Sequence, residues 1–132
     1  MLNIRRLTFS VAILVVAILA AACDPGDVIH FQNKTAEALF VQVNGGGLDR
    51  LPAGKSVDGT YLATRIGSGD DPLHILVIDS RGCTVTSVET TVSRFRKEDD
   101  FKLAIKESDL PPPDQRAPCD PRLADIARRT KE

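Results

Sequence analysis

The hydrophobic pattern divides this 132-residue chain into one dense apolar block and a series of short alternating segments. The block runs from Leu7 to Ala22 and is interrupted only by Thr8 and Ser10. After Asp27, apolar and polar residues alternate with a period of two, which predicts β-strands because successive side chains of a strand point to opposite faces. Gly and Pro between these segments predict turns. The pattern therefore predicts an apolar N-terminal segment followed by a β-rich domain.

The first strands of that domain are predicted at Val28–Asn33 and Leu39–Asn44. Their apolar positions are expected to face inward, namely Ile29, Phe31, Leu39, Val41 and Val43. Over residues 48–57, Pro52 and Gly54 favour an edge strand with a turn, and a further short strand is predicted over 58–66.

The most buried strand is predicted at Leu73–Asp79, which is nearly continuous in apolar and β-branched residues. A compact hairpin turn follows, and Cys83–Val92 is expected to pair back across it. The apolar register of the return strand shifts between Val85 and Val88, which indicates a β-bulge. The charged residues 93–100 fit one helical turn or a loop.

The C-terminal part begins with a last alternating strand over Phe101–Glu107. Prolines then favour an extended, polyproline-like strap, because they cannot donate a regular ladder of hydrogen bonds. Asp120 stands at a helix N-cap and Pro121 at the first helical position. Leu123, Ile126 and Ala127 follow at helical spacing, so the chain is expected to end in a short helix or a disordered tail.

Together, about five to seven short strands separated by Gly and Pro turns predict a mostly β fold. We expect a small antiparallel β-sandwich or half-open barrel over residues 28–107, with the strap and the short helix or tail over 108–132. No helix long enough for a parallel crossover is predicted between Val28 and Glu107. A domain this small buries little core, which makes a disulfide or a membrane tether useful.

The N-terminal segment has the order of regions found in an export signal. Arg5 and Arg6 supply positive charge, the apolar block follows, and three alanines precede Cys23. Because positive charge stays on the cytoplasmic side, the chain after Ala22 is expected on the far side of the membrane. The block is short for a spanning helix, which needs roughly 20 residues, but a transmembrane anchor stays open as an alternative.

The stretch LAAAC at Leu19–Cys23 resembles the lipobox of bacterial lipoproteins, in which small residues precede a cysteine at the end of the apolar block. The match departs from the family pattern at Ala20, where leucine is usual. The resemblance covers only the first 23 residues. It implies a signal peptide over 1–22, cleavage before Cys23 and a diacylglycerol on its sulfur. The same alanines also fit an ordinary signal peptidase site, which would release a soluble protein.

The cysteines form an odd set of three, Cys23, Cys83 and Cys119. If Cys23 is acylated, the other two make an even pair, and we expect them to be bridged in an oxidising compartment. A bridge closing a loop of roughly 36 residues would stabilise the fold by about 3 to 4 kcal/mol. Two reduced thiols are the alternative. Without a C-x-x-C pair, neither thiol redox catalysis nor a thiolate metal site is predicted.

Charge and chemistry add few candidate sites. Removing residues 1–22 lowers Lys plus Arg from 17 to 15 against 18 acids, a net charge of −3, which argues against a nucleic-acid partner. His30 and His74 with Asp70 or Asp71 are the candidate metal ligands. Strand positions for the histidines and turn positions for the acids explain these residues better, so no catalytic, cofactor-binding or metal residue is predicted.

These features predict a membrane-anchored envelope lipoprotein whose domain is a non-catalytic binding or structural module. Its expected partners are the membrane, through the lipid, and an unidentified envelope protein or ligand. The tether over residues 23–27 reaches under about 20 Å, so the domain would stay near the membrane. The resemblance to lipoproteins implies, through Asp24 after the cysteine, retention at the inner membrane where a bacterium has two membranes. The alternative is an exported soluble enzyme or metal-binding protein that uses His30, His74 and nearby acids.

Overall fold

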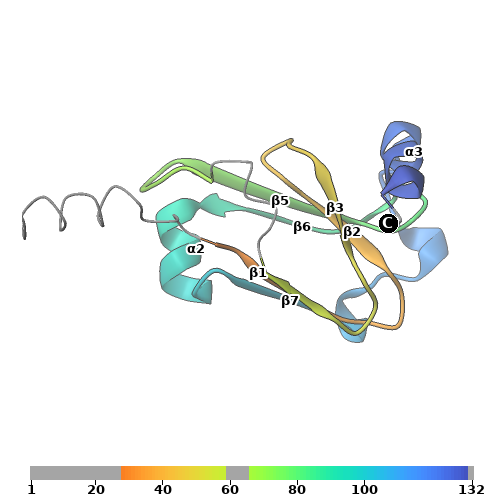
Figure 1. Ribbon diagram of the computed structural model, residues 1–132, viewed down its shortest axis with the longest axis horizontal. Helices are drawn as coiled ribbons and strands as arrows, with labels where there is room; N and C mark the ends of the chain where they lie inside the picture. The colour runs from red at the N-terminus through yellow and green to blue at the C-terminus, as the bar shows by residue number, and fades with distance from the viewer. Residues whose placement is uncertain (1–27, 59–65, 131–132) are drawn as a thin grey trace, which may run out of the picture.

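The computed structural model describes residues 28–58 and 66–130, which form a two-layer β-sandwich (Figure 1). Cys23 and its tether lie outside the described residues, as does nearly all of the short strand expected over 58–66. The elements in chain order are β1 (His30–Lys34), β2 (Leu39–Val43), β3 (Leu48–Leu51), β4 (Ser56–Asp58), β5 (Pro72–Ile78), β6 (Thr84–Thr91), α2 (Val92–Asp99), β7 (Lys102–Lys106), the 3₁₀ turns η1 (Glu107–Asp109) and η2 (Pro113–Gln115), and α3 (Pro121–Arg129).

The two sheets have the strand orders β4-β1-β7 and β3-β2-β5-β6, which confirms the mostly β fold as a small sandwich. The predicted edge segment over 48–57 divides into β3 and β4, which lie at the edges of different sheets. Every pair of strands is antiparallel except β1 and β7, which run parallel. A parallel pair needs a long connection, and here the chain passes through all of the four-stranded sheet between β1 and β7.

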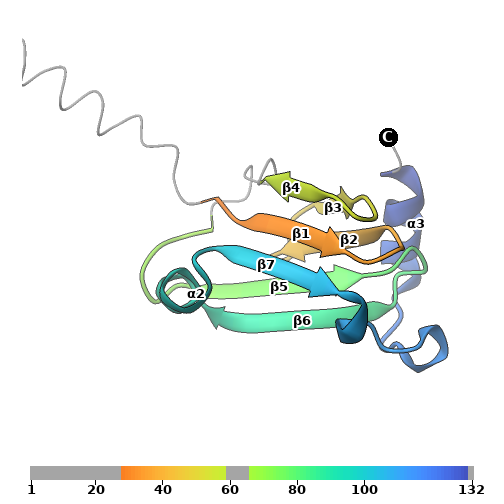
Figure 2. The same ribbon diagram turned by 90° about the horizontal axis from the view of Figure 1, so that it is seen from below.

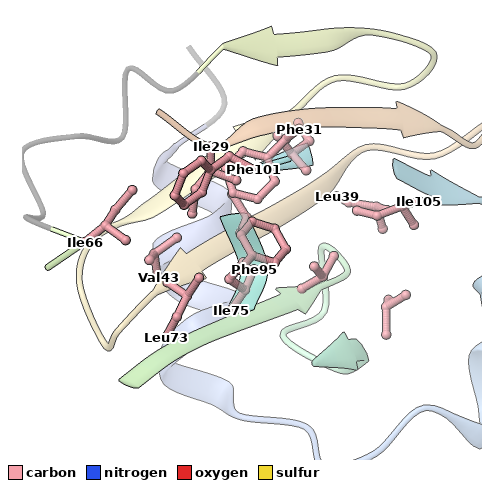
Figure 3. Close-up of a cluster of buried hydrophobic side chains, with 14 of the residues drawn as sticks. Ile29, Phe31, Leu39, Val43, Ile66, Leu73, Ile75, Phe95, Phe101 and Ile105 are labelled. Atoms are coloured by element: carbon pink, nitrogen blue, oxygen red, sulfur yellow. The ribbon is translucent and has the colours of Figure 1, made fainter. Parts of the chain in front are cut away.

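The core lies between the sheets, where the alternation of each strand places its apolar side chains (Figure 3). All five residues expected to face inward from the first two strands are buried. They meet Leu73, Ile75 and Val77 of β5, which confirms this strand as deeply buried. Phe95 and Phe101 close one end of the core, with their ring centroids 5.9 Å apart in an edge-to-face arrangement.

The return strand of the β5–β6 hairpin contains the predicted bulge. Val77 pairs with Thr86 and Ile78 with Thr84, so Val85 is the extra residue. The charged segment that follows forms a complete eight-residue helix, α2, and not a single turn or loop. Its N-cap is Thr91, whose side-chain oxygen accepts a hydrogen bond from a backbone N–H, and its Phe95 is buried. Packing against the core therefore stabilises a helix that its charged sequence did not indicate.

The C-terminal helix α3 has the predicted start, with Asp120 as N-cap and Pro121 in the first turn. It lies on the outer face of the four-stranded sheet, where Ala127 packs against Phe40 and Ile78. Ile126 does not join this contact, since it is 43% exposed.

The two ends of the sandwich differ (Figure 2). The described chain enters at the end that carries α2, where the His30 N–H donates to the Phe101 carbonyl at 2.7 Å. The strap and α3 lie at the opposite end. A tether attached before β1 therefore leaves from the α2 end.

Candidate functional site

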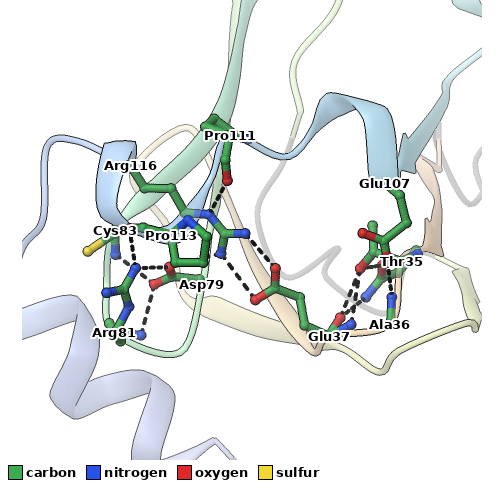
Figure 4. Close-up of polar contacts among 11 residues, drawn as sticks. Thr35, Ala36, Glu37, Asp79, Arg81, Cys83, Glu107, Pro111, Pro113 and Arg116 are labelled. Atoms are coloured by element: carbon green, nitrogen blue, oxygen red, sulfur yellow. Dashed lines mark hydrogen bonds and ion pairs between the residues drawn. The ribbon is translucent and has the colours of Figure 1, made fainter.

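Polar residues are buried mainly beneath the strap, where Arg116 is the central side chain (Figure 4). Its guanidinium donates to both carboxylate oxygens of Glu37, at 2.6 and 3.1 Å, and to Asp79 Oδ2 at 3.1 Å. Its Nε donates to the Pro111 carbonyl at 2.8 Å. The side chains of Arg116 and Asp79 are each only 3% exposed. Arg116 thus links the strap to the β1–β2 connection and to the β5–β6 hairpin.

Asp79 receives hydrogen bonds from several directions. Its Oδ1 accepts the backbone N–H groups of Arg81 at 2.9 Å and Cys83 at 3.0 Å, and Arg81 Nη2 donates to Oδ2 at 3.2 Å. Burial by itself would raise the pKa of Asp79, but the hydrogen bonds from Cys83, Arg81 and Arg116 outweigh burial and hold that pKa below its usual value. Asp79 is therefore the ionised centre of the hairpin turn.

The same end of the sandwich contains a second buried polar group, around Asn33. Its Nδ2 donates to the carbonyls of Glu37 at 2.9 Å and Leu51 at 3.0 Å, and its Oδ1 accepts the N–H and hydroxyl of Thr35. Because Asn33 belongs to β1 and Leu51 to β3, this amide joins the two sheets. Its donors and acceptor are satisfied within the fold, which assigns it to structure.

The chemistry of the Arg116 cluster is that of a structural clamp. Both of its carboxylates already accept hydrogen bonds from Arg116, and the guanidinium is directed at protein acceptors. The hydrogen bond to Glu37 raises the pKa of Arg116, so its charge is permanent. A general acid or base needs a group that can exchange a proton with a substrate. The cluster offers packing and fixed charge, and no such exchange.

A disulfide between Cys83 and Cys119 lies beside this clamp, with an S–S distance of 2.04 Å and a sequence separation of 36. The expected bridge is therefore present, and the reduced alternative is not what the structure contains. Backbone pairing accompanies it, since Thr84 N–H donates to the Pro118 carbonyl at 2.9 Å and Asp120 N–H to the Gly82 carbonyl at 3.0 Å. The strap thus continues the four-stranded sheet for a few residues beyond β6.

The histidines considered as metal ligands are not brought together. His30 is on the outer face of the three-stranded sheet, because its neighbour Phe31 faces the core. His74 is on the outer face of the other sheet, where its Nε2 lies 3.7 Å from Glu89 Oε1. The core separates these two faces.

The acids proposed beside the histidines belong to the turn before β5. Asp71 Oδ2 accepts the backbone N–H of Ser68 at 2.9 Å, and the Asp71 N–H donates to the Ser68 carbonyl at 3.1 Å. Within residues 28–58 and 66–130, no three His, Cys, Asp or Glu side chains are grouped so that they could hold a metal ion. Ser80 lies in the β5–β6 turn, which a Gly82 N–H to Asp79 carbonyl bond of 3.1 Å closes.

Sequence reasoning missed the Arg116–Glu37–Asp79 cluster. Arg116 is separated from Glu37 by 79 residues and from Asp79 by 37, so no local pattern links them. The sequence places Arg116 among the prolines of the strap, and this position does not indicate that its side chain is buried.

Comparison with known proteins gives no relative: no family model, curated protein or solved structure matches the chain. Among the helices of the described residues, none has the length and hydrophobicity needed to span a membrane.

Proposed function

We propose that the chain is a bacterial envelope lipoprotein, anchored through lipid on Cys23, whose β-sandwich is a non-catalytic structural or binding module close to the membrane. The observation that carries this proposal is the order of the N-terminal residues. A charged start, an apolar block and small residues lead directly to Cys23, as in lipoprotein signals.

The disulfide supports the proposal through the cysteine count. Cys83 and Cys119 are bonded to each other, so neither is available to pair with Cys23. A stable disulfide is also typical of proteins outside the cytoplasm. Cys23 is then the cysteine left for another use, and acylation is the use that its neighbouring residues indicate.

The construction of the domain supports a structural or binding role. Its buried charged groups are paired with one another at the strap end, and its two histidines lie on separate faces. A small domain buries a small core, so a disulfide and a buried ion-pair cluster that stabilise it suit a structural or binding module. The metal-binding alternative is not proposed, because the geometry separates the residues it would use.

Fatty-acid labelling tests the proposal. The full-length chain is expressed in a bacterial host supplied with labelled palmitate, and the purified protein is examined for label. We expect label on the wild-type chain and none on Cys23→Ala. The double variant Cys83→Ser/Cys119→Ser is the matched control, since it changes two cysteines and should retain the label. Equal labelling of wild type and Cys23→Ala, or no label on either, would overturn the proposal.

A further inference from the structure

The outer face of the three-stranded sheet is a broad surface that neither α2 nor α3 covers (Figure 2). The register of β1 and β7 places His30 beside Lys102, Gln32 beside Ala104, and Lys34 beside Lys106 on this face. The intervening residues, Phe31 and Ile105 among them, face the core. The four-stranded sheet, in contrast, has α3 on its outer face.

This face, which we call the lysine face, is defined by Lys34, Lys102 and Lys106. All three lysines are exposed. Lys34 and Lys106 form no ion pair with any residue in the described part of the chain, and Lys102 Nζ lies 3.6 Å from Asp100 Oδ2 in an exposed pair that contributes little. Asp58 of β4 is the register partner of His30 at the edge of the sheet, and Asp109 Oδ2 accepts the backbone N–H of Lys106 at 2.9 Å.

Two features of the lysine face need an explanation. Lys34 and Lys106 are register partners on adjacent strands, and like charges in that position repel. The rest of the mature chain is acidic, since its net charge is −3 although these lysines are included. An anionic surface held against the face would relieve the repulsion and account for the uneven distribution of charge.

We infer that the lysine face lies against the anionic lipid headgroups of the membrane that holds the anchor. This inference rests on the proposed function, which supplies the anchor at Cys23. The five residues from Cys23 to Asp27 reach under about 20 Å, and they lead into β1, the central strand of this same sheet. The tether is therefore attached beside the face that we place on the membrane.

Charge argues against the alternative orientation in which the α2 end meets the membrane. That end presents three cationic residues of α2, Arg94, Arg96 and Lys97, but five carboxylates surround them. The carboxylates are Glu98, Asp99 and Asp100 at the end of α2, and Asp70 and Asp71 in the turn whose backbone accepts hydrogen bonds from the start of the helix. An anionic surface would repel this end.

The α3 end is excluded by distance. β6 alone has eight residues, so the sandwich is about 26 Å long, which is more than the tether spans. Of these three surfaces, the lysine face is thus the one whose charge and position both fit. Each lysine near an anionic bilayer strengthens association about fivefold, so three lysines favour this orientation on the order of a hundredfold, and added salt weakens the effect.

Tryptophan reporters test the inference, because the chain contains no Trp. Ala104→Trp places a reporter at the centre of the lysine face, and Gln32→Trp beside it is a second reporter should the first not fold. Ser87→Trp is the matched control, since Ser87 is exposed on β6 in the other sheet. The full lipidated chain is reconstituted in vesicles of phosphatidylglycerol or of phosphatidylcholine that contain a headgroup-level fluorescence quencher.

We expect quenching of Ala104→Trp in phosphatidylglycerol vesicles, at least severalfold stronger than in phosphatidylcholine vesicles or at high salt, with Ser87→Trp little affected. Adding Lys34→Gln and Lys106→Gln to Ala104→Trp should remove most of the quenching, whereas adding Lys97→Gln on α2 should not. Equal quenching of both reporters, or quenching that does not depend on lipid charge, would overturn the inference.

The mass of the same preparation separates this inference from the proposed function. A lipidated chain whose Ala104→Trp is not quenched overturns the orientation alone. A chain without lipid overturns the proposed function, and with it the tether on which the inference depends.

Discussion

Replacing Arg116 with Met should destabilise the domain strongly, because it removes the cation from a buried cluster. Four hydrogen bonds are lost, to Glu37, Asp79 and the Pro111 carbonyl. Removing one partner of a buried ion pair costs about 3 to 5 kcal/mol. Asp79 keeps two backbone N–H donors and Arg81, and the Glu37 side chain is 40% exposed and can rehydrate. We therefore expect the lower value, about 3 kcal/mol.

The assay is urea unfolding of the disulfide-intact protein, followed by far-ultraviolet circular dichroism. With a slope of about 2 kcal/mol/M, the midpoint should fall by about 1.5 M. Arg122→Met is the control, because the Arg122 side chain is 91% exposed and its nearest carboxylate oxygen, on Asp120, is 3.7 Å away. That change should alter the free energy of unfolding by less than about 0.5 kcal/mol. Equal midpoints for the two variants would refute the assignment of Arg116 as the clamp.

A double-mutant cycle sharpens this test. In the wild type, Glu37→Gln weakens a charged contact with Arg116 and should destabilise the fold. In the Arg116→Met background the same change removes a carboxylate that no longer has its partner, so it should cost little or even stabilise. Additive effects of the two substitutions would show that Glu37 and Arg116 act independently, against the contacts described above.

Three further predictions concern the same end of the domain. The double variant Cys83→Ser/Cys119→Ser should lower the free energy of unfolding by about 4 kcal/mol, the chain-entropy value for this loop, and reducing agent should reproduce the effect on the wild type in urea titrations. Gly82→Ala should be severely destabilising in thermal unfolding, because the φ of Gly82 is 75° and an added Cβ would clash with the Asp120 carbonyl oxygen. Gly45→Ala is the control: the φ of Gly45 is 69°, but the space around it is open, so this change should cost only about 1 kcal/mol. Ionised Asp79 should stabilise the fold fully above its unfolded pKa of 3.8, and this stability should be lost as the pH falls further, because the folded pKa is lowered. The unfolding midpoint of the wild type, plotted against pH, should therefore fall at acidic pH, and Asp79→Asn should make this fall smaller.

The parts of the fold that local physics determines could be predicted from the sequence. Alternation in β1 and β2 identified their buried side chains, because a two-residue period leaves little choice of inward face. The nearly continuous apolar residues of β5 indicated a buried strand. The start of α3 followed from Asp120 and Pro121, whose capping roles depend on immediate neighbours. The pairing of Cys83 with Cys119 followed from the number of cysteines, since these two remain once Cys23 is expected to be acylated.

The parts that depend on distant contacts could not be predicted. The parallel pairing of β1 with β7 joins residues about 70 positions apart, and nothing local in either strand specifies a partner. The same holds for Arg116, whose position among prolines gives no indication of burial. α2 was underestimated because its helix depends on the burial of Val92 and Phe95 against the core, and its charged sequence alone does not indicate that contact.

The intact mass of the mature chain, purified from membranes with detergent, tests the central claim most directly. The account predicts a chain that begins at Cys23 and carries the added mass of a diacylglycerol. When lipid esters are hydrolysed, this chain should lose the mass of the ester-linked fatty acids and keep the glyceryl group that is bound to the sulfur as a thioether. A chain of unmodified mass that begins at or near Cys23, or one that retains residues 1–22 as a membrane-spanning segment, would contradict it.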